Sequence, residues 1–177
     1  RNAETYANTY ADTDLVLNAK YSYEEVCCLL GWDKNVNGQN IGGYKYDAKT
    51  NTYPVFINYE KAPDISDSIK YEDRFVSEKK IVAISKQPRT LESPEIKRLK
   101  GWPENGMRTY LFVRKNKDDK DGGKEFYFLG EMHPMQEYAP ITIAGKSAVE
   151  ITYELDHAVD RSLYNYLTSN IEPDEVA

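Results

Sequence analysis

Three segments constrain the fold most strongly, because each has the length of a strand and many β-branched and aromatic residues: Arg108 to Lys115, Glu125 to His133 and Ala148 to Leu155. The polar residues Asp118 to Gly123 separate the first two and are typical of a turn. Lys80 to Ser85 is a shorter run of the same kind. Strands of this type need neighbours, so the sequence predicts a mainly antiparallel, barrel-like sheet.

An earlier part of the chain predicts a β-hairpin. Tyr44 to Tyr46 and Tyr53 to Tyr59 have strand-like patterns, and Asp47 to Asn51 between them suits a turn. Pro54 has no N–H to donate, so we expect it at the start of its strand or on a sheet edge. Ile69 to Phe75 is too short for its periodicity to decide between helix and strand.

Short helices are predicted at the margins of this sheet. Ser22 and Glu25 have the spacing of a capping box, and Gly31 can end the helix that follows. Ser93 to Gly101 has a Ser cap, a Pro in the first helical position and a Gly at its end. Asp160 to Leu167 has apolar residues at helical spacing. The predicted fold class is therefore α+β.

The length of 177 residues suits one domain. We expect a linker or flexible segment over residues 1–18, the domain over residues 19–170 and a tail over residues 171–177. The chain begins without Met, so we expect it to be part of a longer protein. No apolar run approaches the roughly 18 residues that span a bilayer, and we expect no membrane partner.

The two cysteines, Cys27 and Cys28, are adjacent in an apolar helical pattern. Burial of both as reduced thiols is expected, because a disulfide between neighbours is strained. Reduced thiols favour a cytoplasmic location.

Catalytic and metal-binding motifs are missing from the sequence. The only histidines, His133 and His157, match no zinc spacing and no nucleophilic triad. We expect no metal, no cofactor and no catalytic residue in this domain. An alternative is a Mg²⁺ nuclease, in which Glu72, Asp73 and the triplet Glu95-Ile96-Lys97 would supply carboxylates and a lysine.

Charge is distributed unevenly along the chain. The net charge is −6, yet residues 79–117 hold 11 Lys and Arg against 3 Asp and Glu. Such a segment predicts a basic face that contacts DNA phosphates, or a solvated surface without a partner. The residues expected to bind the DNA backbone are Lys79, Lys80, Lys86, Arg89, Lys97, Arg98 and Lys100.

Tyrosine is abundant, with 15 residues, and several are clustered between the Asn- and Gly-rich loop Asn35 to Gly43 and the acidic turn Glu72-Asp73. Many can be ordinary core residues. Alternatively, aromatic rings that sandwich a flipped base, with Glu72 or Asp73 accepting from its amino group, form a nucleobase pocket. The residues expected to line this pocket are Tyr44, Tyr46, Tyr59, Tyr71, Glu72, Asp73 and Phe75, and Tyr53 belongs to the same cluster.

An ordered set of motifs covers roughly residues 20 to 168. The motifs are Tyr23-Glu24-Glu25-Val26, Leu29-Leu30-Gly31-Trp32, Gly43-Tyr44-Lys45, Pro54-Val55-Phe56-Ile57-Asn58-Tyr59-Glu60-Lys61, Asp64-Ile65-Ser66, Lys70-Tyr71-Glu72-Asp73-Arg74-Phe75, Leu91-Glu92-Ser93-Pro94-Glu95, Leu111-Phe112-Val113-Arg114-Lys115 and Phe126-Tyr127-Phe128-Leu129-Gly130. Together they resemble a domain family at the C-terminus of bacterial proteins that also carry a phospholipase-D-type nuclease and a superfamily 2 helicase.

The resemblance implies a target-recognition domain of a type IV restriction enzyme that cuts DNA containing 5-methyl- or 5-hydroxymethylcytosine. It implies an SRA/PUA-like β-barrel that flips the modified base. Double-stranded DNA containing modified cytosine is then the partner, as are the helicase and nuclease domains of the same polypeptide, which would use ATP and Mg²⁺. This chain would not be an enzyme by itself. The alternative is a protein-interaction or autoinhibitory domain that docks on the helicase core.

One segment departs from the family pattern. After the acidic turn the family's next strand is expected to carry an aromatic residue, whereas this chain has Ile81-Val82-Ala83-Ile84-Ser85-Lys86. If that aromatic ring is a wall of the pocket, the wall must come from elsewhere in the chain.

Overall fold

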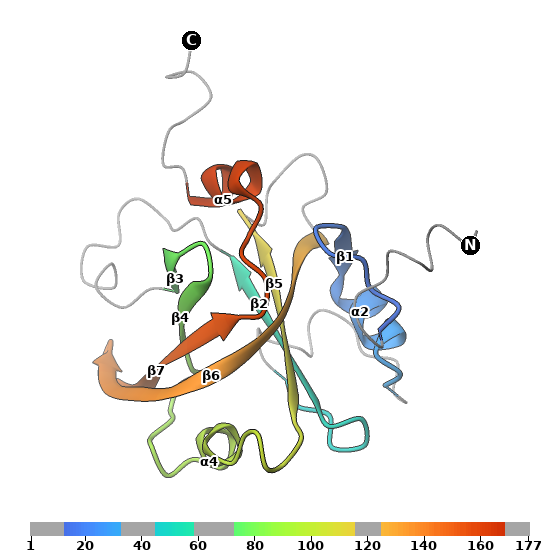
Figure 1. Ribbon diagram of the computed structural model, residues 1–177. Helices are drawn as coiled ribbons and strands as arrows, with labels where there is room; N and C mark the ends of the chain where they lie inside the picture. Colours follow the sequence, from blue (N-terminus) through green and yellow to red (C-terminus); the bar gives the residue numbers. More distant parts are fainter. Residues whose placement is uncertain (1–12, 33–44, 59–72, 116–124, 169–177) are drawn as a thin grey trace.

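The computed structural model describes residues 13–32, 45–58, 73–115 and 125–168 (Figure 1). The elements in chain order are β1 (Lys20–Ser22), α2 (Tyr23–Leu29), β2 (Thr52–Asn58), β3 (Arg74–Ser77), β4 (Lys80–Ile84), α4 (Pro94–Lys100), β5 (Arg108–Arg114), β6 (Glu125–Ile143), β7 (Lys146–Leu155) and α5 (Arg161–Thr168).

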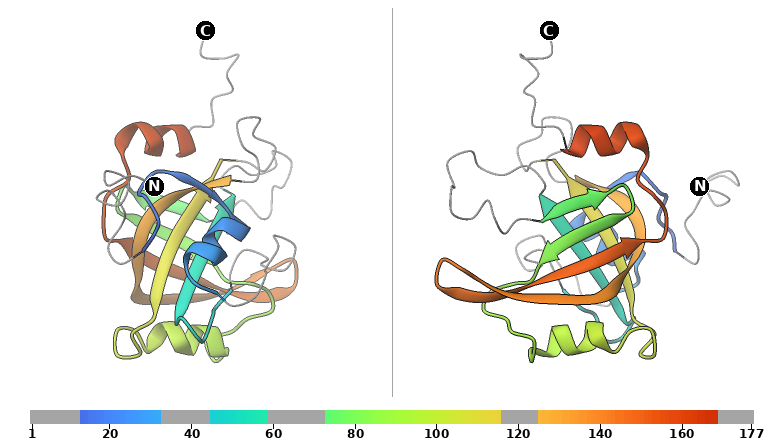
Figure 2. Two further views of the ribbon diagram at one scale, coloured as in Figure 1. Left: turned by 90° about the vertical axis from the view of Figure 1, so that its right-hand side faces the viewer. Right: turned by 60° about the vertical axis from the view of Figure 1, so that its left-hand side comes forward.

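All strands of the described chain belong to one seven-stranded sheet. Its order is β2-β5-β6-β7-β4-β3, and β1 pairs with β6 outside this path. Every pairing is antiparallel except that of β2 with β5, which is parallel. The sheet curls strongly, so that β2 and β3 are the edges of a half-barrel (Figures 1 and 2). The predicted α+β class, mainly antiparallel with short flanking helices, is confirmed.

The prediction of a hairpin over residues 44–59 was wrong. β2 pairs in parallel with β5, from Thr52 beside Arg108 to Asn58 beside Arg114, and a single antiparallel bridge joins Asp47 to Thr52. The physical reason is that both faces of β2 are buried. Side chains that alternate along β2 pack in the two different cores. Pro54 is tolerated because β2 is an edge strand, as expected.

Two cores lie on the two faces of the sheet. The inner core fills the half-barrel, where Ile96 and Leu99 of α4 and Leu167 of α5 join the inward side chains of the strands. The outer core lies under α2, where aromatic residues predominate, and Phe56 stacks on Phe112 with ring centroids 4.9 Å apart. Among the described residues, the interior of the half-barrel is therefore occupied by side chains.

One core residue lies before residue 19, where the domain is predicted to begin. Leu15 is fully buried in the outer core, and the Asn18 N–H donates to Phe128 O at 2.8 Å. Packing therefore begins before residue 19.

The helix ends show how the sequence stops each helix. The α2 capping box is present, since the Glu25 N–H donates to Ser22 Oγ at 3.2 Å and the Ser22 N–H donates to Glu25 Oε1 at 2.9 Å. Gly31 has the positive φ of +82° that favours glycine. Pro94 occupies the first turn of α4 as predicted.

No helix within the residues that the structure describes is long and apolar enough to cross a membrane.

The adjacent cysteines have different environments. Cys27 is buried and Cys28 is exposed, and both are free thiols. Burial raises the pKa of Cys27 to about 11. The expectation that both would be buried was wrong for Cys28, because adjacent residues on a helix point about 100° apart and only one of them can face the core.

β6 and β7 are longer than predicted. β6 continues past His133 to Ile143, and its register with β7 shifts between Pro134 and Tyr138, where Gln136 has a φ of 62°. This irregularity accommodates Pro134, whereas the sequence pattern predicted that the strand would end at His133. The two strands then continue as a two-stranded ribbon, Tyr138–Ile143 paired with Lys146–Ile151.

Candidate nucleic-acid interface

Asp73 lies at the start of edge strand β3 and is half-buried. Its Oδ1 accepts a hydrogen bond of 2.7 Å from the Ile84 N–H, at the end of the neighbouring strand β4. This bond fixes the carboxylate at the rim of the half-barrel. A fixed carboxylate at an accessible rim is suited to accept hydrogen bonds from a ligand's amino group.

Three tyrosines, the tyrosine cluster, lie near one another: Tyr53 of β2, Tyr138 of β6 and Tyr153 of β7, of which Tyr153 lies near Asp73. Burial raises the pKa of all three, that of Tyr138 to about 12. Interactions with Tyr53, Tyr138 and Asp73 raise the pKa of Tyr153 further, which shows that these groups are near one another. The cluster therefore stays protonated and can donate hydrogen bonds.

The Tyr153 hydroxyl is the unusual member of this cluster. Tyr153 is completely buried, and its hydroxyl has no hydrogen-bond partner within the described chain. Buried polar groups are nearly always paired, and an unpaired one has an energetic cost. A group of this kind next to a fixed carboxylate marks a place where the fold is not optimised for stability alone.

Basic side chains surround the same end of the barrel. We call Lys45, Lys86, Arg89, Arg98 and Lys100 the cationic rim. Burial, with smaller contributions from Arg89 and Lys45, lowers the pKa of Lys86. Such mutual repulsion is relieved when an anion binds, as a phosphate group would.

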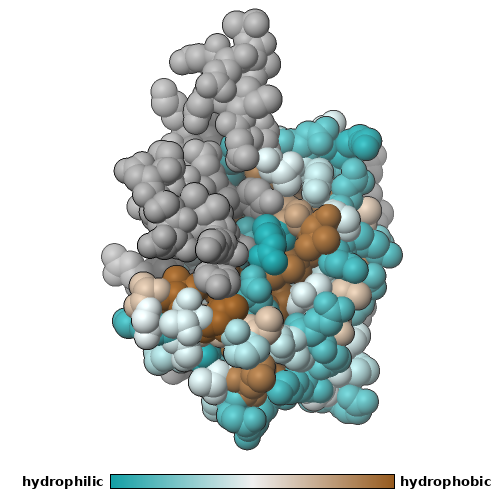
Figure 3. Space-filling view, turned by 90° about the vertical axis from the view of Figure 1, so that its left-hand side faces the viewer, coloured by the Kyte–Doolittle hydropathy of each residue, from teal (hydrophilic) through white to brown (hydrophobic). Residues whose placement is uncertain are grey.

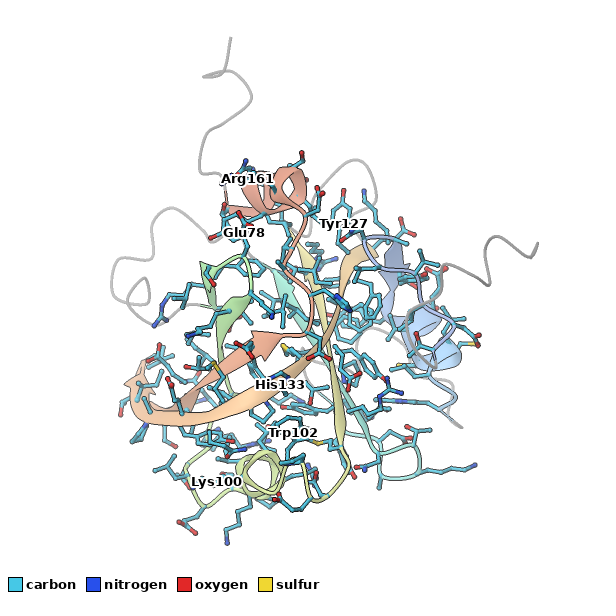
Figure 4. The ribbon with its side chains drawn as sticks, in the orientation of Figure 1. Glu78, Lys100, Trp102, Tyr127, His133 and Arg161 are labelled. Carbon is cyan, nitrogen blue, oxygen red and sulfur yellow. The ribbon has the colours of Figure 1, made fainter. Side chains whose placement is uncertain are left out.

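Helix α4 directs its basic residues in two ways. The Arg98 guanidinium lies 3.9 Å from the centroid of the Tyr46 ring, and Lys100 lies 5.6 Å from that of Tyr138 (Lys100 is labelled in Figure 4). Lys97 points to solvent and pairs loosely with Glu92 at 3.5 Å. Arg98 and Lys100 thus lie against aromatic rings, whereas the Lys97 side chain is exposed to solvent.

The basic residues predicted to bind the DNA backbone fall into two sets. Lys79 and Lys80 lie at the far end of β4, next to the ion pair of Glu78 with Arg161 at 3.8 Å. Seven residues of extended chain separate Lys79 from Lys86, or roughly 20 Å. Figure 4 places Glu78 and Arg161 at the α5 end and Lys100 at the α4 end. The remaining predicted residues, Lys86, Arg89, Lys97, Arg98 and Lys100, are together at the α4 end.

The predicted pocket residues have varied positions. Tyr46 lies under Arg98, and its hydroxyl donates to Asn51 Oδ1 at 2.6 Å. Phe75 is only 9% exposed and packs edge-to-face on Tyr164 of α5, with ring centroids 5.4 Å apart. The other four predicted pocket residues lie outside the described residues: Tyr44, Tyr59, Tyr71 and Glu72.

Sequence reasoning missed Tyr138 and Tyr153. Both lie more than sixty residues after Asp73, and the alternation of β7 predicts only that Tyr153 shares a face with Ile151 and Leu155. The aromatic residue that the family pattern predicts in this strand is absent from β4. Tyr153, on the neighbouring strand β7, lies opposite Ile81 of β4. Only the strand order could have revealed this proximity.

The comparisons with known proteins agree with this fold. The sequence profile of the family described as a domain of unknown function, DUF3427, matches residues 15–167. The chain belongs to this family. No curated protein sequence matches the DUF3427 chain.

Solved structures share the fold of the DUF3427 chain. The DNA recognition domain of the cytosine modification-dependent restriction endonuclease LpnPI has a TM-score of 0.53 at 13% identity, over 98% of this chain and 95% of that one. KRYPTONITE in complex with mCHG DNA and SAH has a TM-score of 0.52 at 9% identity, over 82% and 33%. Arabidopsis thaliana SUVH6 in complex with SAM has a TM-score of 0.52 at 14% identity, over 93% and 31%.

The DUF3427 chain therefore spans nearly all of the LpnPI domain and about a third of the KRYPTONITE and SUVH6 chains. At these identities the likeness shows the fold. The predicted SRA-like barrel is confirmed.

The acidic residues of the DUF3427 domain do not assemble into a metal site in the described parts of the chain. There, no group of three or more His, Cys, Asp or Glu side chains is placed to hold a metal ion. Glu95, which the nuclease alternative would use, forms an ion pair with Arg89, and Glu72 lies outside the described residues. The carboxylate of Asp73 is therefore better placed for hydrogen bonding than for metal binding.

Proposed function

We propose that this DUF3427 domain is the DNA-binding target-recognition domain of a modification-dependent, type IV restriction protein, and that it reads 5-methylcytosine or 5-hydroxymethylcytosine. One observation carries the proposal. A fold shared with the DNA recognition domain of LpnPI, over nearly the full length of both chains, brings a fixed carboxylate, buried tyrosines and a cationic rim to one end of a half-barrel. The resemblance of the sequence motifs to the C-terminal domain family of nuclease and helicase restriction proteins supports the same function.

In this proposal the cationic rim neutralises phosphates and holds the duplex against the α4 end of the barrel. A cytosine that leaves the stack then presents its amino group to Asp73. The carboxylate accepts hydrogen bonds from this group, while its bond from the Ile84 N–H keeps it in position. Tyr71 and its neighbours, with the half-buried Tyr138, would supply the rings that enclose the base.

The domain would have no catalytic residue of its own. The parent protein would supply ATP hydrolysis and Mg²⁺-dependent cleavage through its helicase and nuclease domains, in the cytoplasm where the DNA is. Recognition and cleavage would then be separate, and this chain would bind DNA without cutting it.

Fluorescence anisotropy with matched duplexes tests the proposal. The chain should bind a methylated duplex more tightly than the unmodified one, and Asp73→Asn should remove that preference. Asn keeps an oxygen that can accept from Ile84, so the local fold is retained, but it loses the charge and presents an amide donor to the amino group of cytosine. A full preference in the Asp73→Asn chain would contradict the role of Asp73. Absence of DNA binding, together with tight association to the isolated helicase domain, would favour the docking alternative.

A further inference from the structure

The ribbon of β6 and β7 extends beyond the rest of the sheet. Pairing between β4 and β7 ends at Ile84 opposite Glu150, whereas pairing between β6 and β7 continues to Ile143 opposite Lys146. Among the described strands, none pairs with the outer part of the ribbon except β6 and β7 with each other. Figure 2 shows it projecting from the body of the molecule.

The ribbon is nevertheless held rigidly. Ser85 makes two hydrogen bonds of 2.9 Å with the backbone of Val149. The Gln87 side chain donates to Ile143 O at 2.8 Å and to Lys146 O at 3.2 Å, on both sides of the turn. An isolated two-stranded hairpin is marginally stable in water, so these bonds from the segment after β4 are what fix its direction.

The surface of the ribbon differs from that of the rest of this acidic chain. No Asp or Glu occurs from Tyr138 to Val149, although the net charge of the chain is −6. The side chains exposed on it are small, apolar, hydroxyl-bearing or basic: Ala139, Pro140, Thr142, Ala144 and Lys146. A surface of this kind can approach a polyanion without repulsion.

The surroundings of the ribbon point to the same partner. Lys86 and Arg89 lie on the segment that braces it, and the Arg89 N–H donates to Ser147 O at 3.0 Å. Ile84, which holds Asp73, directly precedes the bracing Ser85. On this side of the molecule, apolar patches lie among hydrophilic residues (Figure 3). A duplex held at Asp73 would therefore extend along the ribbon.

We propose that the ribbon enters the major groove of the duplex bound at Asp73, with Lys86, Arg89 and Lys146 on the phosphates at the groove's edges. This inference rests on the proposed function. The major groove is about 12 Å wide and admits a two-stranded ribbon, whereas the minor groove is about 6 Å wide. Thr142 and the apolar side chains near the turn then meet base edges and thymine methyl groups, so the ribbon reads the sequence that flanks the modified cytosine.

Two charge changes on the ribbon test this inference, with one matched control. Thr142→Glu and Lys146→Glu place a carboxylate in the groove, and both sites are exposed. The control is Arg161→Glu on α5, at the opposite end of the barrel, where the side chain is 77% exposed. The probe is a fluorescein-labelled duplex of about two helical turns, methylated or unmodified, with the full 177-residue chain.

Each ribbon variant should raise the Kd at least about tenfold for both duplexes, and the control by less than about twofold. Methyl green, a major-groove ligand, should compete with the chain, and netropsin, a minor-groove ligand, should not. Lys146→Ala is a second variant that leaves the turn undisturbed, and it should raise the Kd about threefold. Ribbon variants that behave like the control, or competition by netropsin alone, would overturn the inference.

The outcomes separate this inference from the proposed function. If the unaltered chain binds both duplexes equally and the ribbon variants still weaken binding, the groove contact stands and the reading of modified cytosine is wrong. If the unaltered chain prefers the methylated duplex and the ribbon variants match Arg161→Glu, the reverse holds. A chain that binds neither duplex overturns both.

Discussion

Replacing Tyr153 by Phe should stabilise the protein, although the tyrosine is completely buried. Its hydroxyl has no partner in the described chain, and an unpaired buried polar group costs roughly 1 to 3 kcal/mol. Tyr153→Phe removes that group and keeps the ring that packs in the inner core. The free energy of unfolding should therefore rise by about 1 kcal/mol or more.

Urea and thermal unfolding measure this change. For a chain of this length, 1 kcal/mol corresponds to a rise in Tm of roughly 2 to 4 °C. Two matched Tyr→Phe variants should change stability in the opposite direction. The Tyr21 hydroxyl accepts from the Val16 N–H at 2.8 Å, and the Tyr138 hydroxyl donates to Gln136 Oε1 at 3.0 Å. Losing either bond should cost about 0.5 to 1.5 kcal/mol.

The same Tyr153→Phe chain should bind methylated DNA with a smaller preference, because the hydroxyl lies near the Asp73 carboxylate that would accept from the base. Greater stability with weaker discrimination is the usual signature of a group retained for function. A loss of more than about 1 kcal/mol in Tyr153→Phe would contradict this prediction, because it would show that the hydroxyl has a partner in the folded protein.

Three further predictions concern ionisation and charge. Burial raises the pKa of the tyrosine cluster above 10, to about 12 for Tyr138. The contribution of these neutral tyrosines to stability should therefore be fully present below pH 10 and lost as the pH rises towards 12. Urea unfolding at a series of pH values checks this. At pH 8 a thiol reagent should label Cys28 rapidly and Cys27 only on unfolding, since Cys27 is buried with a pKa of about 11; equal rates would contradict the burial of Cys27. Lys97→Ala and Arg98→Ala should weaken binding of all DNA alike and reduce the salt slope by about one each. Only Arg98→Ala should also lower stability, by about 1 kcal/mol, because only Arg98 packs on an aromatic ring; equal unfolding free energies would argue against this contact.

Local signals in the sequence predicted the local structure well. The capping box of Ser22 and Glu25, the proline that opens α4 and the apolar runs of β4, β5 and β7 all correspond to observed elements. Each of these depends on residues a few positions apart. The resemblance to the family added the SRA-like barrel, which local patterns alone described only as barrel-like.

Long-range pairing was not predictable in the same way. β2 pairs with β5 across fifty residues, and nothing local to Tyr53–Asn58 distinguishes this partner from a hairpin neighbour. The same limit applies to the candidate site. Asp73 was predicted from its acidic turn, but the proximity of Tyr153 depends on β4 lying between β3 and β7.

Recognition of modified cytosine by this domain is tested by competition binding at about 0.15 M salt, with a labelled duplex that carries 5-methylcytosine at one site. Unlabelled duplexes of the same sequence, with cytosine, 5-methylcytosine or 5-hydroxymethylcytosine at that site, serve as competitors. A modified duplex should displace the label at a concentration at least about tenfold lower than the unmodified duplex. Equal displacement by all three would show that the domain does not read the modification.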